Sequence, residues 1–112
     1  MLDLIKYGSI YPMSFKIANY INNGNLYVGL ITHKEGYPES WQDLTVNLDI
    51  KCALNKAYID TNNNGNDIIE WLEQNGLGYR TGNYMSSVFC EYPEFEFDME
   101  ILMKHTTVDY RK

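Results

Sequence analysis

The sequence predicts an α+β fold, with a mainly antiparallel sheet of about five to six strands, one central helix and a short C-terminal helix. Short segments in which apolar and polar residues alternate fill the first half of the chain, and clusters of Asn, Gly and Pro separate them. Residues 67–75 instead carry apolar side chains at helical spacing. Strands on both sides of a single helix favour an antiparallel sheet.

The first half of the chain predicts three strands and one hairpin. Residues 2–7 form a short, mostly apolar segment, and residues 13–20 alternate clearly between apolar and polar side chains. Residues 26–32 form the strongest strand candidate, because they are rich in β-forming residues. Asn and Gly tolerate positive φ, so the cluster Asn22–Asn25 predicts a turn that joins the last two segments as a hairpin.

Two further strands are expected before the helix. Residues 41–48 alternate from Leu44 onward, and residues 57–60 form a short β-prone segment. Residues 61–66 contain four Asn and one Gly, and this composition predicts a polar turn.

The central helix is predicted over residues 67–75, where the apolar side chains share one face. Asn66 or Asp67 is expected to cap its start. Gly76 followed by Leu77 predicts a left-handed stop with a hydrophobic contact.

Beyond the helix, the spacing of Gly78 and Gly82 predicts a loop. Strands are expected near residues 87–92 and 94–98, followed by a short helix near residues 99–104. Acidic and apolar residues alternate through most of this last part of the chain.

The length of 112 residues fits one domain over residues 1–105, with residues 106–112 expected to form a frayed C-terminal tail. The formal net charge of −6 argues against direct binding to nucleic acid, whose backbone repels acidic surfaces. No apolar run approaches the roughly 20 residues of a membrane helix, and the first residues do not resemble a signal peptide. Two isolated cysteines, Cys52 and Cys90, fit a reducing compartment. We therefore expect a cytoplasmic protein that does not bind membranes.

The most informative segment is residues 91–100, where acidic and apolar residues alternate from Glu94 onward. In an extended strand the even-numbered acids share one face and the apolar residues share the other. Carboxylates then repeat every ~6.8 Å, twice the strand rise, and such a row could occupy a groove built for a nucleic-acid backbone. The alternative is an ordinary solvated strand face that discourages edge-to-edge pairing. The candidate partner-binding residues are Glu91, Tyr92, Glu94, Glu96, Asp98, Glu100 and Tyr79, with the two tyrosines as aromatic anchors.

A weaker candidate site lies in the Asn-rich turn. Asp60, Asn62 and Asn64, followed by Gly65, match the first ligand positions of a calcium-binding loop. The position that should supply a bidentate acid is Trp71, which cannot ligate a cation. The alternative is a polar turn that feeds a helix cap, and no metal or other cofactor is expected.

Signals of catalysis are weak. His33 and His105 are the only histidines, and neither lies in a recognisable nucleophile motif. Cys90 reads as a packing residue of a strand. The two cysteines and two histidines are too far apart in the chain for typical zinc spacing. We therefore expect that the protein is not an enzyme.

Several short motifs occur in a fixed order along the chain. They are Leu44-Thr45-Val46-Asn47-Leu48, Ala57-Tyr58-Ile59-Asp60-Thr61-Asn62-Asn63, Asn75-Gly76-Leu77-Gly78, Thr81-Gly82, Phe89-Cys90-x-Tyr92-Pro93 and Phe97-Asp98. As a set they resemble a family of small bacterial proteins of unknown function carried on conjugative elements and phages, over roughly residues 25–104. No catalytic residues are assigned to that family, so none is transferred. The resemblance implies a context in which mobile elements use small acidic proteins against host defence, including inhibitors of CRISPR nucleases and DNA-mimicking antirestriction proteins.

The sequence thus favours a non-enzymatic inhibitor of a host defence nuclease, of the anti-CRISPR or antirestriction type. Its acidic face would bind a basic nucleic-acid-binding surface of a protein partner, such as a CRISPR effector nuclease. The alternative is a small accessory protein-interaction module of a mobile element, with no anti-defence role and with a homodimer left open.

Overall fold

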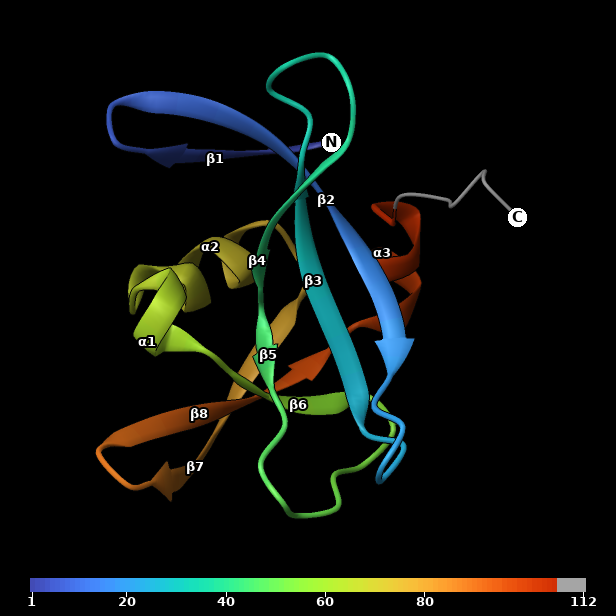
Figure 1. The fold of residues 1–112 in the computed structure, drawn as a ribbon, viewed down its shortest axis with the longest axis vertical. Helices are drawn as coiled ribbons and strands as arrows, with labels where there is room; N and C mark the ends of the chain where they lie inside the picture. The colour runs from blue at the N-terminus through green and yellow to red at the C-terminus, as the bar shows by residue number, and fades with distance from the viewer. Residues whose placement is uncertain (107–112) are drawn as a thin grey trace.

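The computed structural model describes residues 1–106, which form eight strands in two four-stranded sheets together with three small helices (Figure 1). The elements are β1 (Leu2–Lys6), β2 (Ser9–Asn19), β3 (Leu26–Thr32), β4 (Glu39–Asp43), β5 (Thr45–Val46), β6 (Lys56–Ile59), α1 (Thr61–Asn64), α2 (Asp67–Gln74), β7 (Gly78–Ser87), β8 (Cys90–Phe97) and α3 (Met99–Lys104). The prediction of a mainly antiparallel α+β fold is confirmed. The predicted strand count was too low, and α1 is an additional helical turn.

The first sheet has the strand order β1-β2-β3-β4, with each strand antiparallel to its neighbour. The predicted strand over residues 26–32 and its hairpin with the preceding strand are confirmed. A second hairpin joins β1 to β2 through Tyr7 and Gly8, whose φ angles are 53° and 75°. Positive φ at both turn residues matches the right-handed twist of a tight hairpin.

The segment predicted as one strand over residues 41–48 is divided between the two sheets. Its first part, β4, pairs with β3, and its second part, β5, pairs with β6. The backbone N–H of Leu44 donates to the carbonyl of Val28 at 2.9 Å, and the carbonyl of Leu44 accepts from Asp60 at 2.8 Å. The segment therefore passes from the first sheet to the second at Leu44, and its backbone hydrogen bonds connect the two sheets.

The second sheet has the order β5-β6-β8-β7. The loop predicted around Gly78 and Gly82 is wrong, because this segment forms β7, which pairs with β8. Gly78 has a φ of 141° and lies so close to the backbone of Glu96 that a Cβ atom would collide with its carbonyl. These glycines therefore mark a close approach and a bulge within a strand.

The central helix and its stop are as expected, but its cap is not. α2 ends at Gln74, and Gly76 follows with a φ of 77°. The N–H groups of Gly76 and Leu77 donate to the carbonyls of Glu73 and Leu72, each at 3.0 Å, which is the hydrogen-bond pattern of a left-handed helix stop. At the start, Asn66 occupies the cap position without a side-chain capping bond.

The short C-terminal helix α3 spans the predicted residues. Asp98 caps it, because its side chain accepts a hydrogen bond from the backbone N–H of Ile101 at 3.2 Å. Thr106, the first residue of the expected tail, forms a bridge with Phe15. The rest of that predicted tail, residues 107–112, lies outside the described residues.

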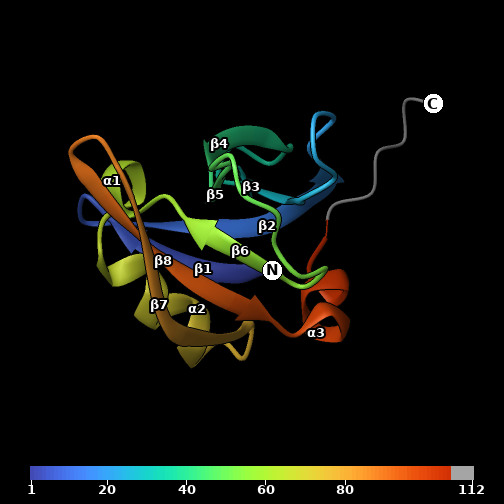
Figure 2. The ribbon, with the colours of Figure 1, turned by 90° about the horizontal axis from the view of Figure 1, so that it is seen from below.

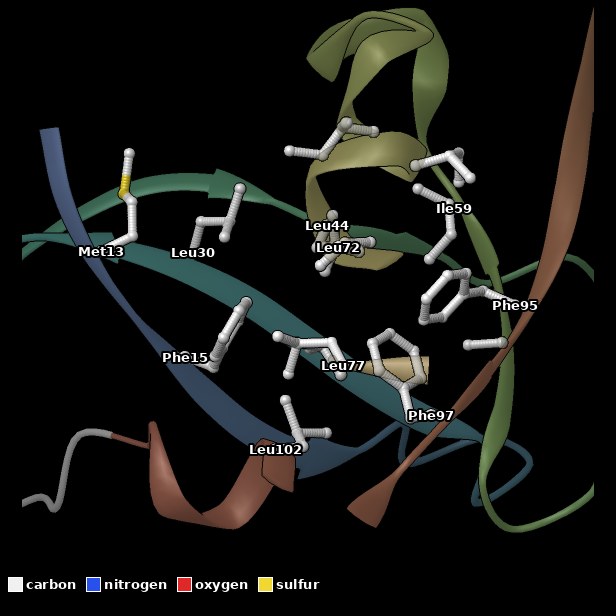
Figure 3. Packing of buried hydrophobic residues seen from close by; sticks show 14 of the residues in the cluster. Met13, Phe15, Leu30, Leu44, Ile59, Leu72, Leu77, Phe95, Phe97 and Leu102 are labelled. Atoms are coloured by element: carbon white, nitrogen blue, oxygen red, sulfur yellow. The ribbon is translucent and has the colours of Figure 1, made fainter. Parts of the chain in front are cut away.

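Both sheets and the helices share one apolar core (Figure 3). Phe15 and Leu30 enter it from the first sheet, Phe95 from the second, Leu72 from α2 and Leu102 from α3. In Figure 2, β3 and β4 lie at one side of the molecule and α2 and α3 at the other, with β6 and β8 between them. Among residues 1–106, no helix has the length and apolar character required to cross a membrane.

Replacing Leu72 by Ala should lower the free energy of unfolding by about 2–5 kcal/mol, because the truncation leaves a cavity in this shared core. Leu72 is 0% exposed, whereas Leu54 is 83% exposed and offers a matched control. Leu54→Ala should change the free energy of unfolding by less than about 0.5 kcal/mol. Equilibrium denaturation in urea measures both, and equal effects of the two substitutions would contradict the assignment of the core.

Candidate functional site

Five of the seven predicted partner-binding residues lie on the hairpin formed by β7 and β8. We call its outer half, residues 84–93, the β7–β8 arm. Within the arm the two strands pair only with each other, because β6 contacts β8 only from Glu94 to Glu96. The arm projects from the body of the molecule at the lower left of Figure 1. Both strand edges of the arm are therefore without a neighbour in the sheet.

Glu94 does not display its carboxylate to solvent, so its predicted role in an exposed acidic row is wrong. The residue is only 8% exposed. Its Oε1 accepts hydrogen bonds from the hydroxyl of Thr81 at 2.8 Å and the amide of Asn83 at 3.1 Å. These two donors flank Gly82, whose φ is 93°, in the irregular stretch where the register of β7 against β8 shifts. The buried carboxylate thus fixes the bulge from which the arm begins.

Glu96 is also engaged within the fold. Its carboxylate lies 3.9 Å from the ammonium of Lys56 on β6 and faces Tyr79, its cross-strand neighbour on β7. The hydrogen bond between Tyr79 and Glu96 raises the pKa of that phenol, since an ionised phenolate would lose the bond and face the carboxylate. The predicted anchor Tyr79 is exposed, and its phenol lies across from the carboxylate of Glu96.

The predicted acidic row does not continue past Phe97, where β8 ends. Asp98 caps α3, and Glu100 lies in the first turn of that helix. The capping bond of an Asp followed by helix-forming residues outweighs the alternation that suggested a longer strand. Glu91 is exposed, but its odd-numbered position in β8 places it on the face opposite Glu94. No continuous row of carboxylates therefore forms along β8.

The tip of the arm carries two exposed apolar side chains. Val88 is 87% exposed and Phe89 is 96% exposed, in the two-residue turn between Ser87 and Cys90. Val88 has a φ of 48°, which is an outlier for a β-branched residue. Exposed Tyr84 lies at the base of the arm, where β7 resumes its pairing opposite Pro93. The sequence prediction missed this turn because the segment contains no Gly, Asn or Asp to signal it.

An ion pair anchors the base of the arm to α2. Arg80 donates from its Nη2 to Oε1 of Glu73 at 2.7 Å and from its Nε to Oε2 at 3.1 Å, and its backbone N–H donates to Oε2 at 2.9 Å. The hydrogen bonds with Arg80 lower the pKa of Glu73. This bidentate ion pair fixes the position of β7 at the residue that precedes the bulge.

Two of the three predicted calcium ligands, Asp60 and Asn64, make hydrogen bonds within the fold. Asp60 caps α1, accepting hydrogen bonds from the backbone and the side chain of Asn63. The buried amide of Asn64 donates to the carbonyls of Asp43 and Asp60, both at 2.9 Å. Within residues 1–106, no group of three or more His, Cys, Asp or Glu side chains could hold a metal ion. The Asn-rich segment forms the short helix α1 with Asp60 as its cap.

One pairing that the sequence analysis missed joins Ser14 to His33. The hydroxyl of Ser14 lies 2.7 Å from Nε2 of His33, a distance typical of nucleophile and base. Ser14 lies opposite Ile31, two residues before His33, so the register of the predicted hairpin could have revealed that the two side chains are close. Ser14 is buried, so a substrate has no direct access to its hydroxyl.

Cys52 and Cys90 are both free thiols, and burial raises the pKa of Cys52, which disfavours its reactive thiolate.

A family model described as Domain of unknown function (DUF4313) matches residues 14–110. The chain belongs to this family. The DUF4313 match includes the whole β7–β8 arm and most of the first sheet. No curated protein and no solved structure matches the chain.

Replacing Glu94 by Ala should lower the free energy of unfolding by about 1–3 kcal/mol, because Thr81 and Asn83 would lose their shared acceptor. Glu94→Gln retains an oxygen at the same position and should cost less. Thermal and urea denaturation measure both variants. If the Glu94 carboxylate were exposed instead, Glu94→Ala would change the free energy of unfolding no more than Glu91→Ala does.

The Glu73–Arg80 pair should make stability depend on pH in the acidic range. The pKa of Glu73 is lowered in the folded state from its ordinary value of 4.5, so its stabilisation is present above that pH and is lost as pH falls through the folded pKa. Glu73→Gln should therefore be less stable than the natural protein at neutral pH. The two stability curves should converge as the pH falls below 4.5. Parallel curves across this range would contradict the assignment.

Proposed function

We propose that this protein is a non-enzymatic protein-binding module that engages its partner through the tip of the β7–β8 arm. The observation that carries the proposal is the nearly complete exposure of Val88 and Phe89 at the end of a projecting hairpin. Aromatic side chains that fill a partner pocket are frequent energetic centres of interfaces. An apolar tip with no packing role of its own is the feature of this fold best suited to such a contact.

The backbone at the tip supports the same proposal. Val88 adopts a positive φ, which costs free energy for a β-branched residue unless the surrounding structure compensates. The conformation turns Val88 and Phe89 outward in adjacent positions. Burial of these two side chains in a partner would contribute about 1.5–3 kcal/mol each. A short hairpin held at its base by Glu94 and Arg80 presents them with little loss of conformational entropy on binding.

The narrower form of the proposal concerns the class of partner. We propose a host defence nuclease of the CRISPR or restriction type, contacted at a basic nucleic-acid-binding surface and inhibited by the contact. The net charge of −6 and the exposed Glu91 beside the tip support a basic partner. Glu91, Tyr92 and Tyr79 remain candidate contact residues, whereas Glu94 and Glu96 support the arm from within the fold.

A second candidate function is an accessory interaction module that pairs with its own copy. β7 is an edge strand of its sheet, and an edge without a neighbour can pair with the same edge of another chain. A homodimer formed in this way would cover the arm. Sedimentation velocity distinguishes the two candidates, because only the second gives a species of twice the chain mass without a partner.

Phe89→Ser should abolish binding of the partner while leaving the fold intact, because Phe89 has almost no contact area within the protein. Ile21→Ser is a matched control, since Ile21 is equally exposed in the turn between β2 and β3. The measurement is inhibition of DNA cleavage by a panel of purified CRISPR and restriction nucleases, at low and high salt. We expect the natural protein and Ile21→Ser to inhibit one member, and Phe89→Ser to fail. Full inhibition by Phe89→Ser would overturn the proposed contact.

A further inference from the structure

We propose that a second surface, the groove between β1 and α2, binds an extended basic segment of a partner protein by adding it as a strand to the edge of β1. The groove has a volume of about 520 Å³, and its walls include Asp3 and Ile5 from β1 and Asp67, Glu70 and Trp71 from α2. The proposal does not depend on the proposed function of the arm, because the two surfaces share no residue.

The edge of β1 offers backbone groups for such pairing. β1 is the outermost strand of its sheet. The turn at Tyr7 and Gly8 closes on the pair Lys6 and Ser9, so the next pair, Ile5 and Ile10, is of the type that exchanges no hydrogen bonds. The carbonyl of Ile10 agrees with this alternation, since it accepts from the ammonium of Lys34 rather than from β1. The N–H and C=O of Ile5 therefore point away from β2, toward the groove edge.

Asp3 follows the same alternation. It pairs with Pro12, which has no N–H to donate, and the carbonyl of Pro12 accepts from His33 instead. The carbonyl of Asp3 also points outward, and it accepts a hydrogen bond from the indole N–H of Trp71 at 2.8 Å. One outward carbonyl of β1 is thus already bonded by a side chain that lines the groove.

The charge of the groove selects a basic occupant. Asp3 lies on the strand side and Asp67 and Glu70 on the helix side, and all three are exposed. Lys6 lies 3.6 Å from Asp67 and offsets part of the charge at one end. Exposed Ile5 supplies apolar surface within the same groove. A strand with Lys or Arg alternating with Val would place its ammonium or guanidinium groups between Asp3 on one side and Asp67 and Glu70 on the other while pairing with β1.

The probe is a seven-residue synthetic peptide of alternating Lys and Val with blocked ends, titrated into the full chain and followed by NMR. We expect the largest shifts at the amides of Asp3 and Ile5 and at the indole N–H of Trp71. A matched peptide with Glu in place of Lys should not bind. A Lys peptide methylated on its backbone nitrogens should bind at least about tenfold more weakly, because it cannot complete the ladder.

Protein variants separate the contribution of the charges from that of the strand pairing. Asp3→Asn combined with Glu70→Gln should weaken binding about three- to tenfold, as expected for two exposed charge contacts. Ile5→Pro removes an outward N–H and spares the bonds to β2, so it should weaken binding without unfolding the protein. Glu35→Gln combined with Glu39→Gln, which removes two exposed acids outside the groove, should leave the affinity unchanged.

Three results would overturn the inference. They are equal binding of the Lys and Glu peptides, full binding of the methylated peptide, and no binding of any peptide at millimolar concentration. The methylated peptide tests the strand pairing on the unaltered protein, so the inference stays testable even if Ile5→Pro fails to fold. Failure here leaves inhibition through Phe89 unaffected, since that test involves the arm alone.

Discussion

The two-sheet architecture depends on the junction at Leu44 and Thr45, where one segment leaves the first sheet and enters the second. Buried backbone groups must be paired, so a strand that changes sheets must find new partners within a residue. The N–H of Leu44 still bonds to β3, its carbonyl already bonds to the residue after β6, and the hydroxyl of Thr45 accepts from the N–H of Val28 at 3.1 Å. Because both backbone groups of Leu44 keep a hydrogen-bond partner where the chain crosses between the sheets, both sheets can close around a single core.

A second constraint, the buried carboxylate of Glu94, shapes the surface we propose to be functional. A carboxylate removed from water requires donors. Thr81 and Asn83, on the two sides of Gly82 in the irregular stretch of β7, both lie within hydrogen-bond distance of its Oε1. The same stretch separates the inner half of the hairpin, which joins β6, from the arm, which does not. Glu94, which the sequence predicts to be an exposed contact residue, thus fixes the position at which the arm begins.

The elements that could be predicted are those with local signals. The strand over residues 26–32, the stop at Gly76 and the helix capped by Asp98 depend on neighbouring residues, and all three are present. The division of β4 from β5 and the strand β7 depend on partners distant in the chain, which periodicity cannot identify. Alternation placed Glu94 on the correct strand but could not say what covers it. The turn at Val88 places a β-branched residue at positive φ, so the residue types that usually indicate a turn are absent and the sequence did not predict it.

The acids of this chain divide into two groups with different physical roles. Glu73, Glu94 and Glu96 have partners within the fold, whereas Asp3, Glu70 and Glu91 are exposed. The ion pairs of Glu73 and Glu96 reduce what these two acids add to a field that attracts a basic partner, whereas the exposed acids contribute fully. Salt screens that field within about 8–10 Å. The proposed contact through the apolar tip involves no charge, so salt does not screen it. Under the proposed function, charge therefore governs how often the partner arrives, while Phe89 governs how long it stays. Net charge alone would have assigned both tasks to the carboxylates.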